Sequence, residues 1–393
     1  MLFQHQASIQ ALGFDWEEDT PAFLLDAGAL EQTLGKVQRL RSLPNVRILY
    51  SIKALPLLAL MEEMLPSIDG FSVSSLFELR LAAELAEPHG HLIHLTSPGL
   101  RLDEGREIMK RATSVSFNSL EQGKRFKSIP TQAGLGFRVN PGLSFLDDVR
   151  YDPSRPASQL GISLTEFVQA IEGDFENERG LHFHNMFEGR DLKPLKVTLQ
   201  HIRQVLGDHF RQIPWMNVGG GYLLNDQRLV EDLERLLVEL MDASPAMEIL
   251  LEPGKGLIGH CGFLITRVVD VFERDGVLIA VLDTGVHHLP EVFEYQKRPS
   301  LLGESAQSSI RALLVGSSCL PGDVFGEYGF QRPPRVDETL IFGSVGAYSM
   351  VKASLFNGHN LPKIFRMSKN GVVQALKGYD YAAFRSRWSD ASF

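Results

Sequence analysis

Cysteine is scarce in this sequence: only two of its 393 residues, Cys261 and Cys319, are cysteine. Two cysteines cannot make the disulfide framework of a small secreted protein, so we expect a reducing compartment, the cytoplasm. Long apolar runs are also missing, since no window approaches the length that crosses a bilayer. The first residues lack a basic segment followed by an apolar one, the pattern of a secretory signal. We therefore expect no membrane partner.

An excess of positive charge is missing as well. The formal net charge is -9 with histidine neutral, and acidic and basic residues are interspersed. This balance argues against a nucleic-acid partner. Hydrophobic residues make up 44% and charged residues 22% of the chain, as in ordinary globular proteins. The length is sufficient for two domains.

Short apolar runs alternate with amphipathic stretches between residues 22 and 255. Strand-like runs lie at 23–25, 46–50, 70–73, 91–95, 114–117, 134–139, 180–184, 215–218 and 248–252. Helical spacing marks 57–64, 76–85, 200–206 and 229–240. This alternation predicts βαβ units and a parallel sheet, and about eight units fit a (β/α)8 barrel. We assign residues 22–255 to that barrel.

The pattern changes after Gly256. Apolar segments with a period of two and little helical spacing follow at 262–272, 277–282, 309–315 and 339–342. They predict an antiparallel β domain over 256–393. We expect the N-terminal segment 1–21 to complete this domain.

Barrel enzymes act at the carboxyl ends of their strands, so polar residues at those ends are site candidates. Lys53 follows the strand expected at 46–50. From position alone, a lysine facing water at the barrel mouth is the favoured interpretation. The alternative is a buried amine with a depressed pKa, which would readily form a Schiff base.

Three more polar residues lie at predicted strand ends. Arg138 could bind an anion or simply form a salt bridge, and the two readings are about equal. His182 and His184 lie on one side of their strand, because side chains alternate. A metal site would need a third ligand at suitable spacing, and none is visible, so two core histidines are the simpler alternative.

A glycine triplet, Gly219, Gly220 and Gly221, follows the strand expected at 215–218. Such a turn lets the backbone approach an anion, although alone it more often marks a tight turn. Glu252 closes a further strand and could serve a protonated ring nitrogen or a salt bridge.

The order of these features resembles the fold-type III pyridoxal-phosphate decarboxylases, and within them the carboxynorspermidine (carboxyspermidine) decarboxylases of polyamine and spermidine biosynthesis. The resemblance runs from about Thr20 to Pro362. Its most specific motifs are Leu181-His182-Phe183-His184, the stretch Ser318 to Tyr328, Tyr348-Ser349-Met350-Val351-Lys352, and Phe356-Asn357-Gly358. It implies an alanine-racemase-like barrel followed by a β domain.

The resemblance implies four residues around the ring of pyridoxal 5'-phosphate. Lys53 carries the cofactor as a Schiff base, and His184 stacks on the pyridine ring. Glu252 pairs with the pyridine nitrogen, and Arg138 lies beside the lysine and the cofactor. The cofactor is an electron sink, and a carboxylate at its ring nitrogen favours that role.

The resemblance also implies phosphate and substrate contacts. The turn Gly219–Gly221 and Tyr348 hold the phosphate. Cys319 and Asp323 reach the site from the neighbouring subunit of a homodimer, and Glu291 binds substrate. A thiol can protonate the carbanion at neutral pH, which is the role implied for Cys319.

The implied substrate is an amino acid with a long amine-bearing chain, with carboxynorspermidine or carboxyspermidine leading. Asp323 supports this prediction, because a buried carboxylate favours a cation. Leu320 stands where diaminopimelate decarboxylases have an acid. Three positions depart from the family pattern. Lys255 stands where the family usually has an acid, and Gln159 stands where it usually has an arginine. Phe187 replaces a small residue or cysteine.

Three alternatives remain in view. Another basic or diamino acid could be the substrate of the decarboxylase. A racemase shares the two-domain plan but commonly places arginine at the ring nitrogen, whereas this chain has Glu252. A catalytically silent cofactor-binding homologue usually lacks the lysine or the cysteine, and both are present here.

Overall fold

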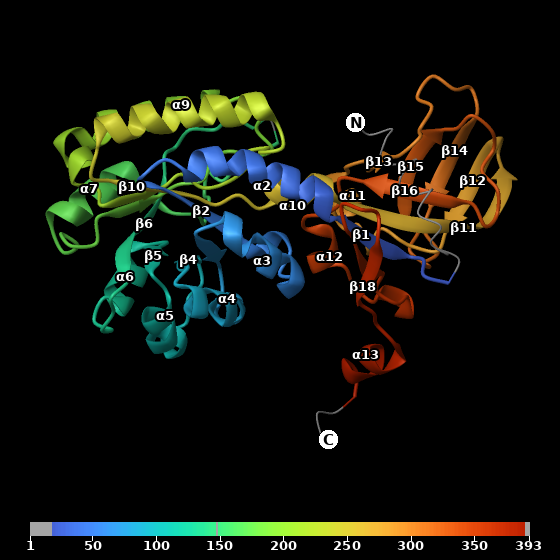
Figure 1. Cartoon of the computed structure of the whole chain (residues 1–393), viewed down its shortest axis with the longest axis horizontal. Coiled ribbons are helices and arrows are strands. Elements are labelled where there is room, and N and C mark those ends of the chain that lie inside the picture. The colour runs from blue at the N-terminus through green and yellow to red at the C-terminus, as the bar shows by residue number, and fades with distance from the viewer. Residues whose placement is uncertain (1–17, 147, 390–393) are drawn as a thin grey trace. The chain divides into compact units, whose positions relative to one another are not determined.

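The computed structural model describes residues 18–146 and 148–389, which form two compact units (Figure 1). One unit contains residues 32–257. The other contains residues 18–31 and 258–389. The chain passes between the units within helix α2 (Ala27–Arg41) and at the end of α10 (Lys255–Ile258).

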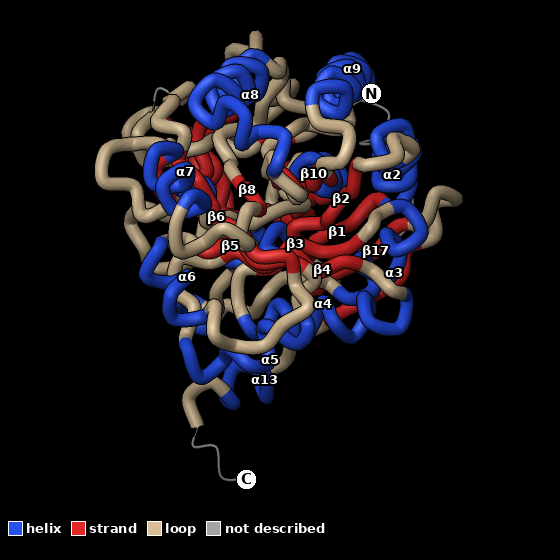
Figure 2. Tube along the Cα trace, turned by 90° about the vertical axis from the view of Figure 1, so that its left-hand side faces the viewer, coloured by secondary structure: helices blue, strands red, loops and turns tan. Residues whose placement is uncertain are grey.

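A closed barrel of eight parallel strands forms the centre of the first unit, as predicted (Figure 2). In order around the barrel the strands are β2 (Val46–Ser51), β3 (Gly70–Val73), β4 (Leu92–Thr96), β5 (Ser114–Phe117), β6 (Gly134–Asn140), β8 (Gly180–His182), β9 (Trp215–Asn217) and β10 (Glu248–Leu251). The pairing of β10 with β2 and of β5 with β6 closes the ring. A short strand, β7 (Ile162–Ser163), adds to β6. Apart from β6, which is partly buried, these strands are almost wholly buried, as their continuous apolar runs indicate.

Helices connect and cover the strands. They are α2, α3 (Leu58–Met64), α4 (Leu76–His89), α5 (Gly105–Arg111), α6 (Leu120–Phe126), α7 (Leu164–Glu172), α8 (Lys193–Leu206) and α9 (Gln227–Ala243). In α9 the buried leucines recur at helical spacing, and the side chain of Asp226 accepts from the first backbone N–H groups. The helices expected around 57–64, 76–85, 200–206 and 229–240 are confirmed as α3, α4, α8 and α9.

A nine-stranded sheet forms the second unit. Its strands are β1 (Ala22–Asp26), β11 (Gly262–Arg274), β12 (Val277–Leu282), β13 (Ser300–Leu301), β14 (Arg311–Val315), β15 (Val324–Gly329), β16 (Thr339–Gly343), β17 (Lys363–Met367) and β18 (Val373–Lys377). Short helices α11 (Glu291–Tyr295), α12 (Ser349–Lys352) and α13 (Tyr381–Ser386) accompany it. The sheet is mostly antiparallel, but β1 with β17 and β12 with β14 are parallel pairs.

The strand expected at 23–25 is β1, and it does not join the barrel. It pairs with β11 and β17, so it belongs to the sheet of the second unit. The expected contribution of residues 1–21 to that unit falls largely outside the described residues, which begin at residue 18.

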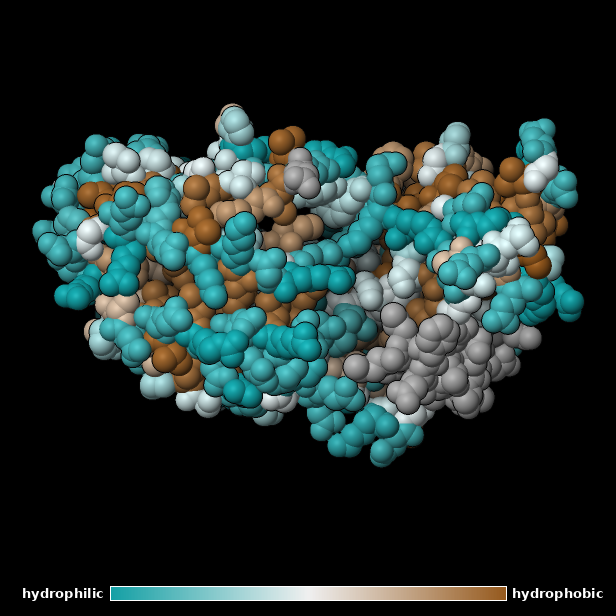
Figure 3. Space-filling model, turned by 90° about the horizontal axis from the view of Figure 1, so that it is seen from above, coloured by the Kyte–Doolittle hydropathy of each residue, from teal (hydrophilic) through white to brown (hydrophobic). Residues whose placement is uncertain are grey.

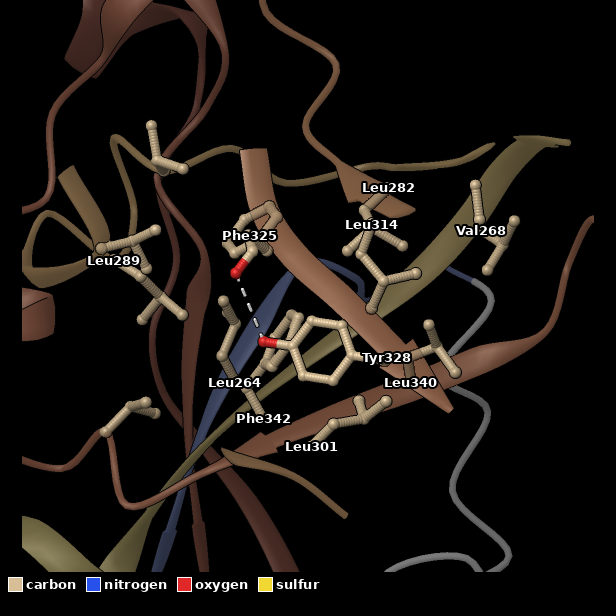
Figure 4. Packing of buried hydrophobic residues seen from close by; sticks show 14 of the residues in the cluster. Leu264, Val268, Leu282, Leu289, Leu301, Leu314, Phe325, Tyr328, Leu340 and Phe342 are labelled. Carbon is tan, nitrogen blue, oxygen red and sulfur yellow. Dashed lines mark hydrogen bonds between the residues drawn. The ribbon is translucent and has the colours of Figure 1, made fainter. Parts of the chain in front are cut away.

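An aromatic and aliphatic core supports the sheet (Figure 4). Phe325 stacks on Phe342 with ring centroids 5.1 Å apart. The Tyr328 hydroxyl donates to the carbonyls of Pro299 at 2.8 Å and Phe325 at 3.5 Å. Burying each such aromatic side chain stabilises the fold by about 2–3 kcal/mol. This core fixes β15, which follows directly on the segment that carries Cys319.

Hydrophilic residues cover most of the face drawn in Figure 3, with smaller hydrophobic areas between them. None of the helices in residues 18–146 and 148–389 is long and apolar enough to cross a membrane.

Candidate active site

Four of the predicted site residues meet at the carboxyl end of the barrel. Lys53 lies in a short 3-10 turn directly after β2, and Arg138 lies near the end of β6. His184 follows β8 by two residues, and Glu252 follows β10 by one. Their charges act on one another, since Glu252 and Arg138 both shift the pKa of Lys53. The arrangement places an amine, a guanidinium, an imidazole and a carboxylate at one barrel mouth.

The Lys53 side chain has exposed surface, yet protein atoms surround it closely enough for burial to lower its pKa. Glu252 opposes this shift, whereas the nearby positive charge of Arg138 adds to it. A lower pKa increases the neutral fraction of the amine, which is the nucleophilic form. The interpretation favoured from position alone, a lysine simply facing water, does not account for this environment.

The Glu252 carboxylate is buried, and neighbouring strands hold it. Asn217 Nδ2 donates to Glu252 Oε1 at 2.7 Å. The Glu252 backbone N–H donates to the carbonyl of Gly219 at 2.8 Å. The same environment lowers the pKa of Arg138 to about 10, chiefly through burial, while Glu252 raises it. The carboxylate is therefore fixed in position beside a guanidinium.

The imidazole of His184 is fixed as a neutral ring. Its Nδ1 accepts the backbone N–H of Gly220 at 3.1 Å. Burial lowers its pKa to about 3, and the charges of Lys53 and Arg138 add to this shift. A neutral ring that is held at one edge can present its face to a planar group.

Each glycine of the triplet is needed by the backbone path. Gly219 and Gly221 have φ of 71° and 92°, where other residues are strained. A Cβ on Gly220 would lie 2.2 Å from the Glu252 carbonyl oxygen. The Gly219 N–H donates to Asn217 Oδ1 at 2.9 Å, so the turn also orients the residue that holds Glu252.

Replacing Gly220 with alanine should lower the free energy of unfolding by about 1–3 kcal/mol, because the Cβ would displace the backbone of Glu252. The matched control is Gly35→Ala in α2, where a Cβ meets nothing within 4 Å. That change should raise stability by about 0.5–1 kcal/mol. Urea unfolding of both variants measures the difference. Equal midpoints would contradict the close approach.

Two histidines deeper in the barrel flank Glu252. His94 Nε2 lies 3.8 Å from Oε1, and His182 Nε2 lies 3.7 Å from Oε2. Burial is the main cause that lowers the pKa of His94 and brings that of His182 well below its ordinary value. Sequence reasoning missed His94 and Asn217. The available signal was polar residues inside strands of a barrel whose interior is otherwise apolar.

Acid should destabilise this unit through its buried histidines. In the unfolded chain, histidine has a pKa of about 6.5. Below that pH, the unfolded chain binds protons at His94, His182 and His184, whereas the folded chain does not, because the pKa values of these residues are lowered. The free energy of unfolding therefore falls as pH falls through this range, by up to about 1.4 kcal/mol per pH unit for each histidine. Urea unfolding at pH 7 and pH 5 should show a shallower loss for His184→Gln than for the unchanged chain. Identical losses would contradict the assignment.

The sheet unit carries Cys319 and Asp323 on one loop. Cys319 is exposed, and its backbone N–H donates to Asn357 Oδ1 at 3.0 Å. Asp323 is buried: Oδ1 accepts the Val286 N–H at 2.7 Å, and Oδ2 accepts the N–H of Ser318 at 3.1 Å as well as its hydroxyl. Oδ2 of Asp323 thus organises the loop that presents Cys319, and Oδ1 ties this loop to Val286.

Tyr348 and Glu291 also lie in the sheet unit. Tyr348 precedes α12 with φ of 65°, a left-handed conformation that is uncommon for a tyrosine and often marks a functional position. Glu291 begins α11 and is half-buried. Among the described residues, no three His, Cys, Asp or Glu side chains are grouped as a metal ion would require.

Three residues depart from the family pattern: Lys255 begins α10, and Phe187 and Gln159 lie on loops that follow barrel strands. Lys255 Nζ pairs with Glu188 Oε1 at 2.7 Å. Phe187 is exposed, and its ring stacks on that of Tyr151 with centroids 5.5 Å apart. Gln159 lies on the same loop as Tyr151, and its carbonyl accepts from Asn118 Nδ2 at 2.8 Å.

Comparisons with known proteins agree with this architecture. The family described as "Pyridoxal-dependent decarboxylase, C-terminal sheet domain" matches residues 47–346. A carboxyaminopropylagmatine decarboxylase of Synechocystis sp. is 30% identical, covering 94% of this chain and 95% of its own. A carboxynorspermidine/carboxyspermidine decarboxylase of Herminiimonas arsenicoxydans is 27% identical, covering 94% and 99%. The structure of a carboxynorspermidine decarboxylase from Campylobacter jejuni, complexed with norspermidine, has a TM-score of 0.82 at 26% identity, covering 94% and 99%.

Proposed function

Because the chain belongs to the pyridoxal-dependent decarboxylases, we propose that it decarboxylates carboxynorspermidine or carboxyspermidine in polyamine biosynthesis. It is a carboxy-lyase that depends on pyridoxal phosphate. The observation that carries the proposal is the buried Glu252 carboxylate held beside Lys53 and Arg138. Relatives that act on these two compounds, aligned over nearly the whole chain, support the substrate.

The residues at the barrel mouth fit the cofactor. When bound, pyridoxal phosphate supplies an electron sink for the electrons that the departing carboxylate leaves behind. Lys53 would hold the cofactor covalently through Nζ, and the neutral ring of His184 would stack on it. The Glu252 carboxylate would face the ring nitrogen of the cofactor and favour the protonated form of that nitrogen. Arg138 would balance the charge of Glu252 beside the lysine.

Phosphate binding is proposed for the glycine turn together with Tyr348. The N–H groups of Gly219 and Gly220 already donate to Asn217 and His184. We therefore expect the turn to contribute its last residue, Gly221. The cofactor-binding domain is proposed to be the barrel unit, residues 32–257; the range first assigned to it, 22–255, also included β1, which pairs with strands of the β domain.

We further propose a homodimer with shared active sites. Cys319 would supply the proton from Sγ to the α-carbon, and Asp323 and Glu291 would lie on the substrate side. The family resemblance and the exposed position of Cys319 support this arrangement. An exposed thiol also suits the reducing cytoplasm, the compartment that we propose.

Two of the residues that depart from the family pattern, Phe187 and Lys255, favour a second candidate substrate. This is carboxyaminopropylagmatine, on which the Synechocystis relative acts. Its far end is a guanidinium, a planar cation that stacks well on aromatic faces. Phe187 offers such a face, and the Tyr151 ring beside it already lies 5.4 Å from the guanidinium of Arg150. The charge of Glu188 is meanwhile balanced by Lys255.

A screen for released CO2 tests the proposal directly. The panel contains carboxynorspermidine, carboxyspermidine, carboxyaminopropylagmatine, diaminopimelate, ornithine, lysine and arginine. We expect the carboxylated triamines to be turned over with the highest kcat/KM. Higher kcat/KM for diaminopimelate would overturn the substrate assignment. Racemisation without CO2 would indicate the alternative reaction, and a bound cofactor without either activity would indicate a silent homologue.

Replacing Asp323 with asparagine should lower kcat/KM about 10- to 100-fold, because an amide NH2 would face the N–H groups of Val286 or Ser318. A loss common to all substrates would show that Asp323 acts by organising the Cys319 loop. A loss larger for the carboxylated triamines than for ornithine and lysine would show direct contact with the distal ammonium of the longer chains. No loss would show that Asp323 has neither role.

A further inference from the structure

A layer of polar side chains lies inside the barrel beneath Glu252. The strand pairing sets Arg138 of β6 beside His182 of β8, and His182 beside Asn217 of β9. Across the barrel, His94 of β4 pairs with Ser114 of β5. Barrel interiors are normally filled with branched apolar residues. A polar layer at this depth therefore needs a physical reason.

His94 in this layer is fully bonded. Its Nδ1 and Nε2 lie 2.7 Å and 3.0 Å from the hydroxyls of Ser114 and Ser116. These distances lock the ring, which crosses that of His182 edge-on with centroids 5.5 Å apart. His94 thus forms a rigid support on one side of His182 and beside Glu252 Oε1.

His182 differs, because within the described part of the chain neither of its ring nitrogens has a hydrogen-bond partner. The side chain is 1% exposed, so water does not satisfy these atoms by surface contact. Leaving a buried polar atom unpaired is costly, and natural structures rarely retain one without a reason. An apolar side chain of similar size would fill the site without this cost.

The carboxylate of Glu252 is the acceptor within reach. His182 Nε2 lies 3.7 Å from Oε2, so an approach of about 0.8 Å would make an ordinary hydrogen bond. The other groups that act on His182 are Arg138, His94, His184 and Lys53, and all of them disfavour a positive charge on its ring. A neutral imidazole retains one N–H donor, which suffices for this bond.

We propose that His182 is a positioning residue that donates from Nε2 to Glu252 Oε2 and aims the carboxylate at the barrel mouth. Asn217 holds Oε1 and His182 holds Oε2, so both oxygens are tied from the strand side. The carboxylate plane is then fixed, and its remaining lone pairs face the mouth. The inference rests on the proposed pairing of Glu252 with the cofactor's ring nitrogen.

Three variants of the cofactor-loaded enzyme test the inference: His182→Phe, His182→Gln and Glu252→Gln. Phenylalanine keeps an aromatic ring, somewhat larger than imidazole, without a donor. Glutamine places an amide N–H near the former Nε2. We expect His182→Phe to lower kcat about 10- to 100-fold with little change in KM, since a hydrogen bond to a charged group is lost. His182→Gln should recover most of that loss. Half-buried His209, which pairs with Glu172 away from Glu252, provides the control His209→Phe, with no expected change in kcat.

The spectrum of the bound cofactor between pH 6 and pH 9 provides a readout other than activity. His182→Phe should shift its titration in the same direction as Glu252→Gln. In the double variant, His182→Phe should add little to the loss caused by Glu252→Gln, because the two act as a unit. Two results would overturn the inference. One is an equal loss of kcat in His182→Phe and His182→Gln. The other is an unchanged kcat in His182→Phe although Glu252→Gln lowers it. A harmless Glu252→Gln would instead overturn the proposed role of Glu252. If His182→Phe does not fold, a His182→Gln enzyme with unchanged kcat and spectrum would support the inference, and one as impaired as Glu252→Gln would overturn it.

Discussion

Lys53→Ala is expected to abolish turnover, with kcat falling by roughly 10³-fold or more, because Lys53 is the residue proposed to hold the cofactor covalently. In the unchanged enzyme, borohydride reduction should fix the cofactor to a single lysine. Peptide mapping of the reduced protein should place the pyridoxyl group on Lys53. The lowered pKa of this lysine is the physical reason, since it supplies a neutral amine at the barrel mouth.

The control for this experiment is Lys36→Ala. Lys36 lies on α2, and its Nζ donates to the carbonyl of Asn225 at 2.6 Å. We expect this variant to bind cofactor and turn over substrate as the unchanged enzyme does. A pyridoxyl label on any lysine other than Lys53 would show that the assignment is wrong.

The barrel could be predicted because its signal is local. Each of the strands β2 to β10 that form the barrel is a short buried run, and the amphipathic helices between them are legible from their spacing. The assignment of β1 failed for the opposite reason. Locally, 23–25 followed by a helix has the same pattern as a barrel unit. Its membership is decided by pairing with β11 and β17, about 240 and 340 residues farther along the chain.

Long-range pairing also explains which features of the sheet unit could not be predicted from the sequence. The strand β15 was not predicted, because Gly326 and Gly329 interrupt its apolar pattern and glycine weakens any strand signal. Its formation depends on the ladder with β14 and on the packing of Phe325 against Phe342. The two parallel pairs, β1–β17 and β12–β14, likewise follow from long-range pairing that alternation in the sequence does not reveal.

The charged residues of the candidate site could be predicted from the sequence, but the residues that hold them in position could not. Lys53, Arg138 and Glu252 are conspicuous, because each ends or follows an apolar run. His94 and Asn217 lie within such runs, where the sequence does not tell which face points inward. The sequence also did not show what the Asp323 carboxylate binds. It was expected to await a substrate ammonium, but it already accepts hydrogen bonds from Ser318 of its own loop and from Val286 of another loop.

Cys319→Ala should lower kcat by about 10²- to 10⁴-fold, the usual contribution of a positioned proton donor. Cys319 is exposed on a loop that Asp323 and Asn357 hold in place, so the substitution should leave the fold unchanged. Thermal unfolding and the cofactor spectrum should therefore match those of the unchanged enzyme. Decarboxylation in deuterated water followed by analysis of the product would report on proton delivery to the α-carbon. Unchanged kcat would exclude Cys319 as the donor.

Mixing the inactive Lys53→Ala and Cys319→Ala proteins tests the proposed shared site. If Lys53 of one subunit works with Cys319 of its partner, each mixed dimer contains one intact site and one doubly defective site. Random exchange at equal concentrations makes half of the dimers mixed, so specific activity should recover to about a quarter of the unchanged enzyme. Sites built within single chains would give no recovery, because every chain lacks one of the two groups. Subunit exchange must be verified independently, for example with a mass-labelled partner. An absence of recovery despite that exchange would show that Lys53 and Cys319 do not meet across a dimer.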